Sequence, residues 1–139
     1  MLAVVDANEL FSLLIKGNGK SEMLFFSENV ELLAPEKILL EFARHKSEIL
    51  KKTHRSNEEF SRLLSIAEKR IELVPKEEYN PYLPKALSLL PTHPKDAQYF
   101  ALALKYSCIL WSEEKLLKKQ SSVIVLNTQE FFEKLVKEP

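Results

Sequence analysis

The chain begins with an apolar run that stops abruptly at a carboxylate. Leu2 to Val5 are all apolar and partly β-branched, and Asp6 follows them before the pattern becomes helical. Such a run is typical of a strand covered on both faces, as in a parallel sheet. Ligands of open α/β sheets bind beyond the carboxyl ends of the strands, which makes Asp6 a candidate site residue. The alternative is that Asp6 or Asn8 caps the next helix, and on this stretch alone capping is the better interpretation.

Strands and helices alternate along the rest of the chain. Short apolar runs predict strands at residues 31–34, 71–74, 108–111 and 123–126. Helical patterns cover residues 8–15, 21–27, 56–69 and 79–90, and the first of them stops at Gly17, Asn18 and Gly19. Turn signals interrupt residues 79–90. Three further helices are predicted, a long one opened by Pro35, one after Asp96 and one from Thr128. This order predicts one α/β domain over residues 1–139, with a mainly parallel sheet of about five strands and helices on both faces.

Composition removes several classes of protein. Basic and acidic residues number 20 each, so no overall positive field indicates nucleic-acid binding. Only two glycines occur, which excludes Gly-rich phosphate loops. The lone Cys108 is incompatible with an internal disulfide and, with no apolar stretch near the roughly 18 residues of a membrane span, predicts a soluble cytoplasmic protein.

The most basic stretch runs from residue 44 to residue 55. It carries His45, His54 and one acid, Glu48, together with the cations Arg44, Lys46, Lys51, Lys52 and Arg55. A solvated helix face is the ordinary interpretation, and a phosphate-contacting edge is the functional one. His45, His54 and His93 lie in unrelated contexts and are interpreted as surface or loop residues rather than as bases or ligands.

Four acidic positions recur at similar structural places. They are Asp6 after a strand, Glu41 early in a helix, Asp96 at the start of a helix, and Glu113 or Glu114 after a strand. Carboxylates at one sheet edge repel one another unless a cation neutralises them, and hard ions such as Mg²⁺ or Mn²⁺ prefer oxygen ligands. Such a site suits phosphodiester hydrolysis. Twenty acidic residues guarantee some at strand ends, so spacing alone does not establish the site.

Five motifs, in this order, resemble those of PIN domains, which are metal-dependent ribonucleases. They are VVDANEL, LLEFARH, HPKDAQYFALALKY, ILWSEEKLL and VIVLNTQEF. The resemblance runs nearly end to end. It implies a three-layer α/β/α sandwich and an acidic pocket that binds Mg²⁺ or Mn²⁺ for endonucleolytic cleavage of RNA, with water as the nucleophile.

The resemblance also implies roles for individual residues. Asp6, Glu41 and Asp96 match the family's metal-binding acids by type, and Asn8 matches the usual polar neighbour of the first. Ser112 matches the hydroxyl residue that orients the pocket. Glu114 stands where many members carry aspartate, which leaves direct, water-mediated or absent coordination open. Lys95 replaces a frequent acid and is a candidate contact for substrate phosphate.

Partners and competing functions follow from the same resemblance. A short PIN protein is often the toxin of a toxin–antitoxin pair, held by a small antitoxin, while others process RNA. The competing class is a non-catalytic PIN-like module that binds RNA or protein. A phosphoryl-transfer protein with Asp6 as nucleophile ranks lower, because Asn8 stands where the Asp-x-Asp motif of such phosphatases has its second aspartate. The apolar face within residues 79–90 and the family habit predict a homodimer, and Trp111 is a candidate for the pocket mouth.

Overall fold

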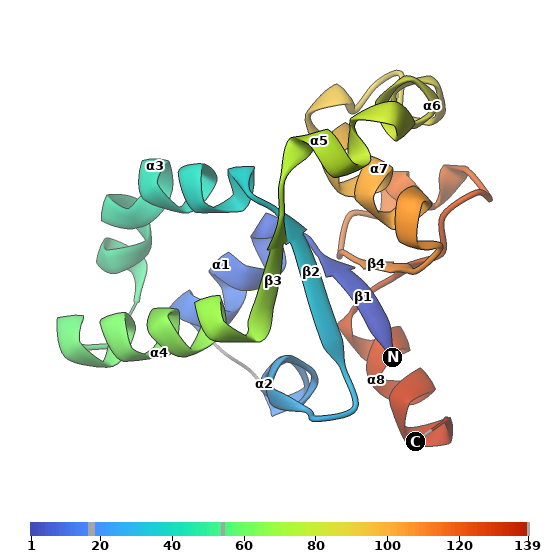
Figure 1. The fold of residues 1–139 in the computed structure, drawn as a ribbon. Helices are drawn as coiled ribbons and strands as arrows, with labels where there is room; N and C mark the ends of the chain where they lie inside the picture. The colour runs from blue at the N-terminus through green and yellow to red at the C-terminus, as the bar shows by residue number, and fades with distance from the viewer. Residues whose placement is uncertain (17–18, 54, 139) are drawn as a thin grey trace.

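The computed structural model describes residues 1–16, 19–53 and 55–138. The turn expected at Gly17 and Asn18 and the surface position expected for His54 lie outside these ranges. Figure 1 shows the chain from its N-terminus in β1 to its C-terminus after α8.

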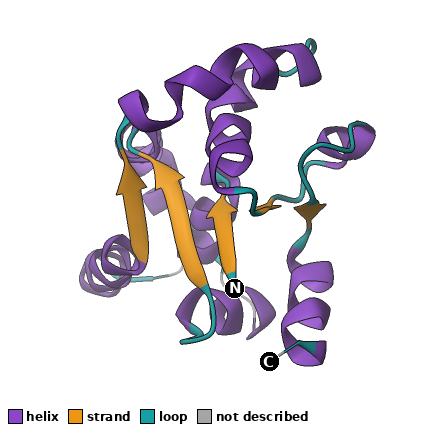
Figure 2. Cartoon of the chain, turned by 45° about the vertical axis from the view of Figure 1, so that its right-hand side comes forward, coloured by secondary structure: helices purple, strands orange, loops and turns teal. Residues whose placement is uncertain are grey.

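A five-stranded parallel sheet forms the centre of the molecule, in the order β3-β2-β1-β4-β5 (Figure 2). The strands are β1 Leu2–Val5, β2 Glu31–Pro35, β3 Ile71–Val74, β4 Ile109–Trp111 and β5 Val125–Leu126. The chain first builds outward from β1 to β3, and then returns to place β4 on the other side of β1. The order therefore reverses between β1 and β4, where ligands of doubly wound sheets bind.

Helices cover the sheet to give a three-layer α/β/α sandwich, which confirms the predicted fold class. Helix α7 lies against β1, β2 and β4, while α1 packs on α3 and α4, and α2 packs on α8. The helices are α1 Ala7–Ile15, α2 Gly19–Phe26, α3 Lys37–Lys52, α4 Asn57–Arg70, α5 Lys76–Tyr79, α6 Leu83–Leu89, α7 Ala97–Tyr106 and α8 Thr128–Lys137. Short 3-10 turns occupy Asn80–Tyr82, Pro94–Asp96 and Lys115–Lys119.

Side chains at the helix starts explain why these segments become helical where they do. Asp6 accepts a hydrogen bond from the backbone N–H of Asn8, and Ser56 accepts one from that of Glu59. At α8, Asn127 and Glu130 form a reciprocal capping box. Each bond satisfies a backbone donor that has no partner inside its helix.

Pro35 does not open the third helix, so that prediction is wrong. It is the last residue of β2 and pairs with Val74 of β3. The next residue, Glu36, donates its backbone N–H to the Val74 carbonyl at 3.2 Å. Parallel pairing with β3 therefore extends the strand through Pro35, and α3 begins only at Lys37.

Two strands begin later than predicted because groups outside the sheet form hydrogen bonds with the backbone of their first predicted residues. Cys108 donates its N–H to Ala103 at the end of α7, so β4 begins at Ile109. The Gln120 amide bonds both the N–H and the carbonyl of Val123, at 2.8 and 2.9 Å, and β5 begins at Val125.

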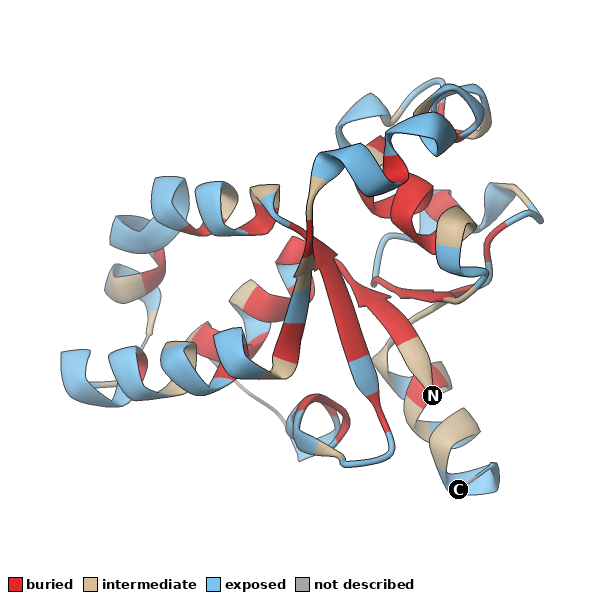
Figure 3. Ribbon diagram, viewed as in Figure 1, coloured by how far each residue is buried: buried red, intermediate tan, exposed pale blue. Residues whose placement is uncertain are grey.

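Buried residues run along the strands and α7 (Figure 3). The apolar face within residues 79–90 mostly joins this core, because Ala86 and Leu90 are buried and α6 packs on α7. Leu87 remains exposed. No helix in the described part of the chain is long and apolar enough to cross a membrane.

Candidate active site

Asp6 lies at the point where the strand order reverses. Its backbone N–H donates to the Trp111 carbonyl of β4 at 3.1 Å, so the two strands hold it in place. Asp6 is 7% exposed, with its Oδ1 receiving the Asn8 N–H at 3.3 Å and its Oδ2 receiving the Ser112 hydroxyl at 2.7 Å. Asp6 thus caps α1 and also stands at the carboxyl end of β1, so capping does not exclude the predicted role in a site.

Ser112 follows β4 and links Asp6 to the next loop. Its side chain is buried, donates to Asp6, and accepts the backbone N–H of Glu114 at 3.1 Å. The Glu114 side chain is exposed, and its Oε1 accepts the N–H of Leu116 at 3.2 Å. Glu114 therefore caps the turn that follows it, while its charge still reaches Asp96 and raises that group's pKa.

Asp96 stands immediately before α7 without capping it. Its side chain makes no cap hydrogen bond, so the carboxylate is available for other interactions. Burial raises its pKa, while the charges of Lys95, His93 and Lys37 act in the opposite direction. His93 therefore belongs to the surroundings of this acid, which sequence context did not indicate.

Glu41 is held by two neighbours that the sequence reasoning did not assign to the site. Lys37 Nζ lies 3.0 Å from Glu41 Oε1 and donates to the Lys95 carbonyl at 2.9 Å. The Tyr99 hydroxyl donates to Glu41 Oε2 at 3.3 Å. The spacing of Lys37 and Glu41, four residues apart on one helix, was the available sequence signal.

The acids influence one another through their charges. Burial raises the pKa of Asp6, the Ser112 and Asn8 hydrogen bonds oppose that rise, and the charges of Asp96 and Glu41 add to it. Carboxylate oxygens have the chemistry that Mg²⁺ and Mn²⁺ prefer, so the donor set fits such an ion. Among the described residues, no three His, Cys, Asp or Glu side chains converge as a ready metal-binding group.

The basic stretch divides into engaged and available cations. Arg55 donates to the Leu14 carbonyl at 3.1 Å and lies 3.8 Å from Glu22, so it caps the end of α1. Lys52 pairs with Glu48 at 2.8 Å. Within the described ranges, no ion pair involves the exposed Arg44, Lys46 or Lys51.

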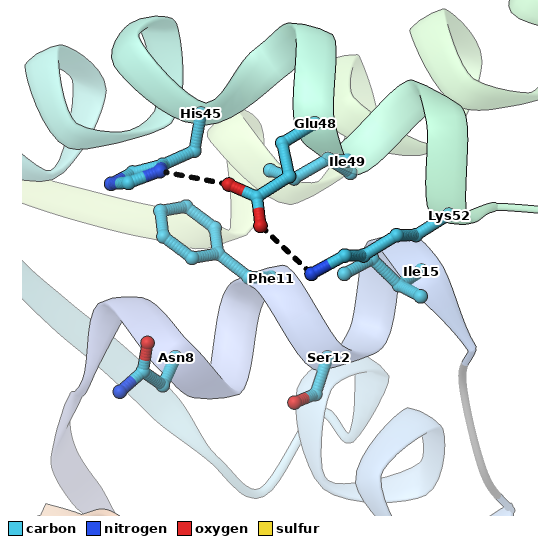
Figure 4. Close-up of a pocket in the computed structure, with 8 residues that line it drawn as sticks. All are labelled: Asn8, Phe11, Ser12, Ile15, His45, Glu48, Ile49 and Lys52. Carbon is cyan, nitrogen blue, oxygen red and sulfur yellow. Dashed lines mark hydrogen bonds and ion pairs between the residues drawn. The ribbon is translucent and has the colours of Figure 1, made fainter.

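A hollow of about 370 Å³ lies between α1 and α3 (Figure 4). Asn8 and Phe11 line it from α1, and His45 and Lys52 line it from α3. Its one acid, Glu48, pairs with both His45 and Lys52. The hydrogen bond and charge of Lys52 lower the pKa of Glu48, so this acid stays ionised and is engaged by its neighbours on α3.

Glu9 and Glu113 form a carboxyl pair that the sequence did not predict. Glu9 of α1 is buried and contacts Thr128 at the start of α8, where Glu113 also binds. The signal was the spacing of Glu9 and Leu13, which places Glu9 on the buried helix face. Trp111 does not line the pocket mouth, because its ring is buried against Phe25 and Phe131 and its Nε1 donates to Thr128 Oγ1 at 3.1 Å.

Comparison with known proteins agrees with this architecture. A family model described as PIN domain matches residues 4–133. A solved structure described as VapBC2 from Rickettsia felis bound to a DNA fragment from their promoter has a similar fold, with a TM-score of 0.70 at 15% identity over 91% of this chain and 98% of that chain. No curated protein gives a significant match.

Proposed function

The chain belongs to the PIN-domain family, and we propose that it is a Mg²⁺- or Mn²⁺-dependent endoribonuclease that hydrolyses RNA phosphodiester bonds. The observation that carries this proposal is the pairing of Asp6 with Ser112 at the reversal of strand order, within electrostatic reach of Glu41 and Asp96. PIN domains are generally nucleases.

The proposed roles follow from the contacts of each acid. Asp6, Glu41, Asp96 and Glu114 would hold the ion, whose chemistry would be to activate water for attack and to stabilise the leaving oxygen. Ser112 keeps Oδ2 of Asp6 in a fixed direction through its 2.7 Å hydrogen bond. Tyr99 bonds Oε2 of Glu41 and Lys37 pairs with Oε1, so each oxygen of this carboxylate is fixed by its own partner.

Polar and cationic side chains near this edge are proposed to guide the RNA. Asn8 and Lys95 are next to the acids, whereas Arg44, Lys46 and Lys51 extend along α3. Glu41 and Lys51 are ten residues apart on that helix, or about 15 Å at 1.5 Å per residue. Lys52 and Arg55 were also predicted to contact RNA. Lys52 already pairs with Glu48 and Arg55 bonds the Leu14 carbonyl of α1, so both are less available to bind phosphate.

We further propose that one PIN domain spans residues 1–139 and works in the cytoplasm, where its RNA substrates are. The VapBC2 neighbour supports a role as the toxin of a toxin–antitoxin pair with a small antitoxin partner, and RNA processing is the second role. A homodimer through exposed Leu87 of α6 is part of this proposal, although most of that face packs on α7.

A non-catalytic PIN-like module is the alternative, and it is favoured by Lys37, which neutralises Glu41 within the acidic edge. A cleavage assay separates the two functions. Metal-depleted protein is mixed with single-stranded RNA, and Mn²⁺ or Mg²⁺ is added in steps. We expect cleavage only with added ion, and a loss of at least a hundredfold in Asp6→Asn and Asp96→Asn. Equal cleavage by the wild type and both variants would contradict the nuclease function.

A further inference from the structure

Glu9 carries a buried carboxyl that the proposed nuclease chemistry does not use. It follows Asp6 by three residues and is 5% exposed. Its Oε2 receives one long hydrogen bond, from Thr128 Oγ1 at 3.4 Å, and its Oε1 has no hydrogen-bond partner among the described residues. A buried polar atom without a partner is costly, so the site lacks a group that would satisfy it.

Glu113 faces the same hydroxyl from the loop after β4. Its Oε2 accepts the backbone N–H of Thr128 at 2.8 Å and lies 3.3 Å from Thr128 Oγ1. The Thr128 hydroxyl accepts from Trp111 Nε1 and has one proton, so it can donate to only one of the two carboxyls at a time.

No positive charge compensates this pair in the described part of the chain. None of the ion pairs found there includes Glu9 or Glu113. Burial, followed by the charge of Glu113 and by the hydrogen bond that a protonated Glu9 shares with it, raises the pKa of Glu9 to about 9. Two carboxyls in this position therefore need a proton or a cation between them.

We propose that Glu9 and Glu113, together with the Thr128 hydroxyl, form a binding site for a hard divalent cation that is separate from the Asp6–Asp96 edge. Ions of the Mg²⁺ and Mn²⁺ class are commonly bound by one or two carboxylates and retain several waters. The exposed Glu113 gives the ion access from solvent, and the unpartnered Oε1 of Glu9 supplies a buried ligand.

Such an ion would join α1, the loop after β4 and the start of α8. That loop also carries Ser112 and Glu114, so the clamp would fix the segment that orients Asp6. The inference goes beyond nuclease activity and does not depend on it, because a PIN protein that cleaves no RNA would bind the ion equally well.

Terbium(III) luminescence tests the site, since Tb³⁺ is a hard oxygen-binding cation and the chain has a single tryptophan. Trp111 bonds the Thr128 hydroxyl and would sensitise an ion there. The titration uses the Asp6→Asn variant, which weakens the other site and retains a good helix cap. We expect saturable luminescence in this variant, displaced by Mn²⁺, and at least tenfold weaker binding once Glu9→Gln or Glu113→Gln is added.

Glu133→Gln in the same Asp6→Asn background is the matched control, because Glu133 is exposed on α8 and contacts Gln129. It should leave the titration unchanged. Glu113 is itself exposed, so its variant remains informative if Glu9→Gln impairs folding, which circular dichroism reports. Identical titrations with and without the Glu9 and Glu113 changes, or no luminescence in Asp6→Asn alone, would overturn the proposal. RNA cleavage plays no part in this test, so its failure and that of the nuclease function are distinguishable.

Discussion

Asp6 and Glu9 are three residues apart at the same helix start, yet their carboxyls have opposite surroundings. Asp6 receives two hydrogen bonds, from Ser112 and from the Asn8 backbone, which oppose the effect of burial on its pKa. Burial raises the pKa of Glu9 to about 9, the neighbouring Glu113 carboxyl adds to that rise, and one long bond from Thr128 opposes it. The comparison shows that hydrogen-bond donors reduce, and a neighbouring carboxyl increases, the effect of burial on the pKa of an acid.

The largest effect that separates the two acids is expected in the pH dependence of stability. The folded-state pKa of Glu9 is raised from 4.5 to about 9, so folded protein binds more protons than unfolded protein between these values. The stability that Glu9 contributes is therefore fully present below pH 4.5 and is lost as pH rises towards 9, by up to about 1.4 kcal/mol per pH unit. Urea unfolding in EDTA should show this slope in the wild type and a flatter one in Glu9→Gln. If the free energy of unfolding depends on pH equally in the wild type and in Glu9→Gln, Glu9 does not have the raised pKa that distinguishes it from Asp6.

Ser112→Ala should have the next largest effect, on the Asp6 side of the comparison. It removes the 2.7 Å donor to Asp6 and the acceptor of the Glu114 N–H, and should lower the free energy of unfolding by about 1–3 kcal/mol. Ser88→Ala in exposed α6 is the control, with an expected change within about 0.5 kcal/mol. Urea unfolding at pH 7 measures both, and equal losses would show that Ser112 does not support Asp6.

Thr128→Val tests the Glu9 side with a smaller expected effect. Valine leaves the Trp111 indole N–H without its acceptor, at a cost of about 1 kcal/mol because Thr128 is only half-buried. Thr128→Ser keeps the hydroxyl and should retain both the stability and the tryptophan emission of the wild type. A Thr128→Val protein with unchanged emission and stability would contradict the contact.

Glu114→Asp should have the smallest effect on stability. The side chain is exposed, and aspartate caps a following turn about as well as glutamate does here, so the change should stay within about 0.5 kcal/mol. If Glu114 ligates the ion, the shorter side chain changes Mn²⁺ affinity in calorimetry. An unchanged affinity would remove Glu114 from the ligand set.

The parts of the fold that sequence could predict are those set by local pattern. The run from Leu2 to Val5, the stop at Asp6 and the alternation of strands and helices led to the parallel sheet that the structure confirms. Pro35 was misplaced because pairing with Val74 of a distant strand, rather than local preference, decides its conformation.

The candidate site shows the same division. The acids at strand and helix ends follow from sequence position, but the engagement of Arg55 with the α1 carbonyls depends on tertiary packing. The same applies to Lys37 against the Lys95 carbonyl, and to Glu9 and Glu113 at Thr128, which are joined only when α8 returns to α1. Contacts of this separation leave no periodic trace in a single sequence.

Mn²⁺-dependent cleavage of a single-stranded RNA by the wild type, Asp6→Asn and Glu133→Gln tests the central claim most directly. All three proteins are metal-depleted, shown to be folded by circular dichroism, and assayed at the same Mn²⁺ concentration. The geometry at the β1–β4 reversal predicts cleavage by the wild type and Glu133→Gln, and a loss of at least a hundredfold in Asp6→Asn. Cleavage by Asp6→Asn at the wild-type rate, or none by the wild type, would contradict the claim that this edge is a nuclease active site.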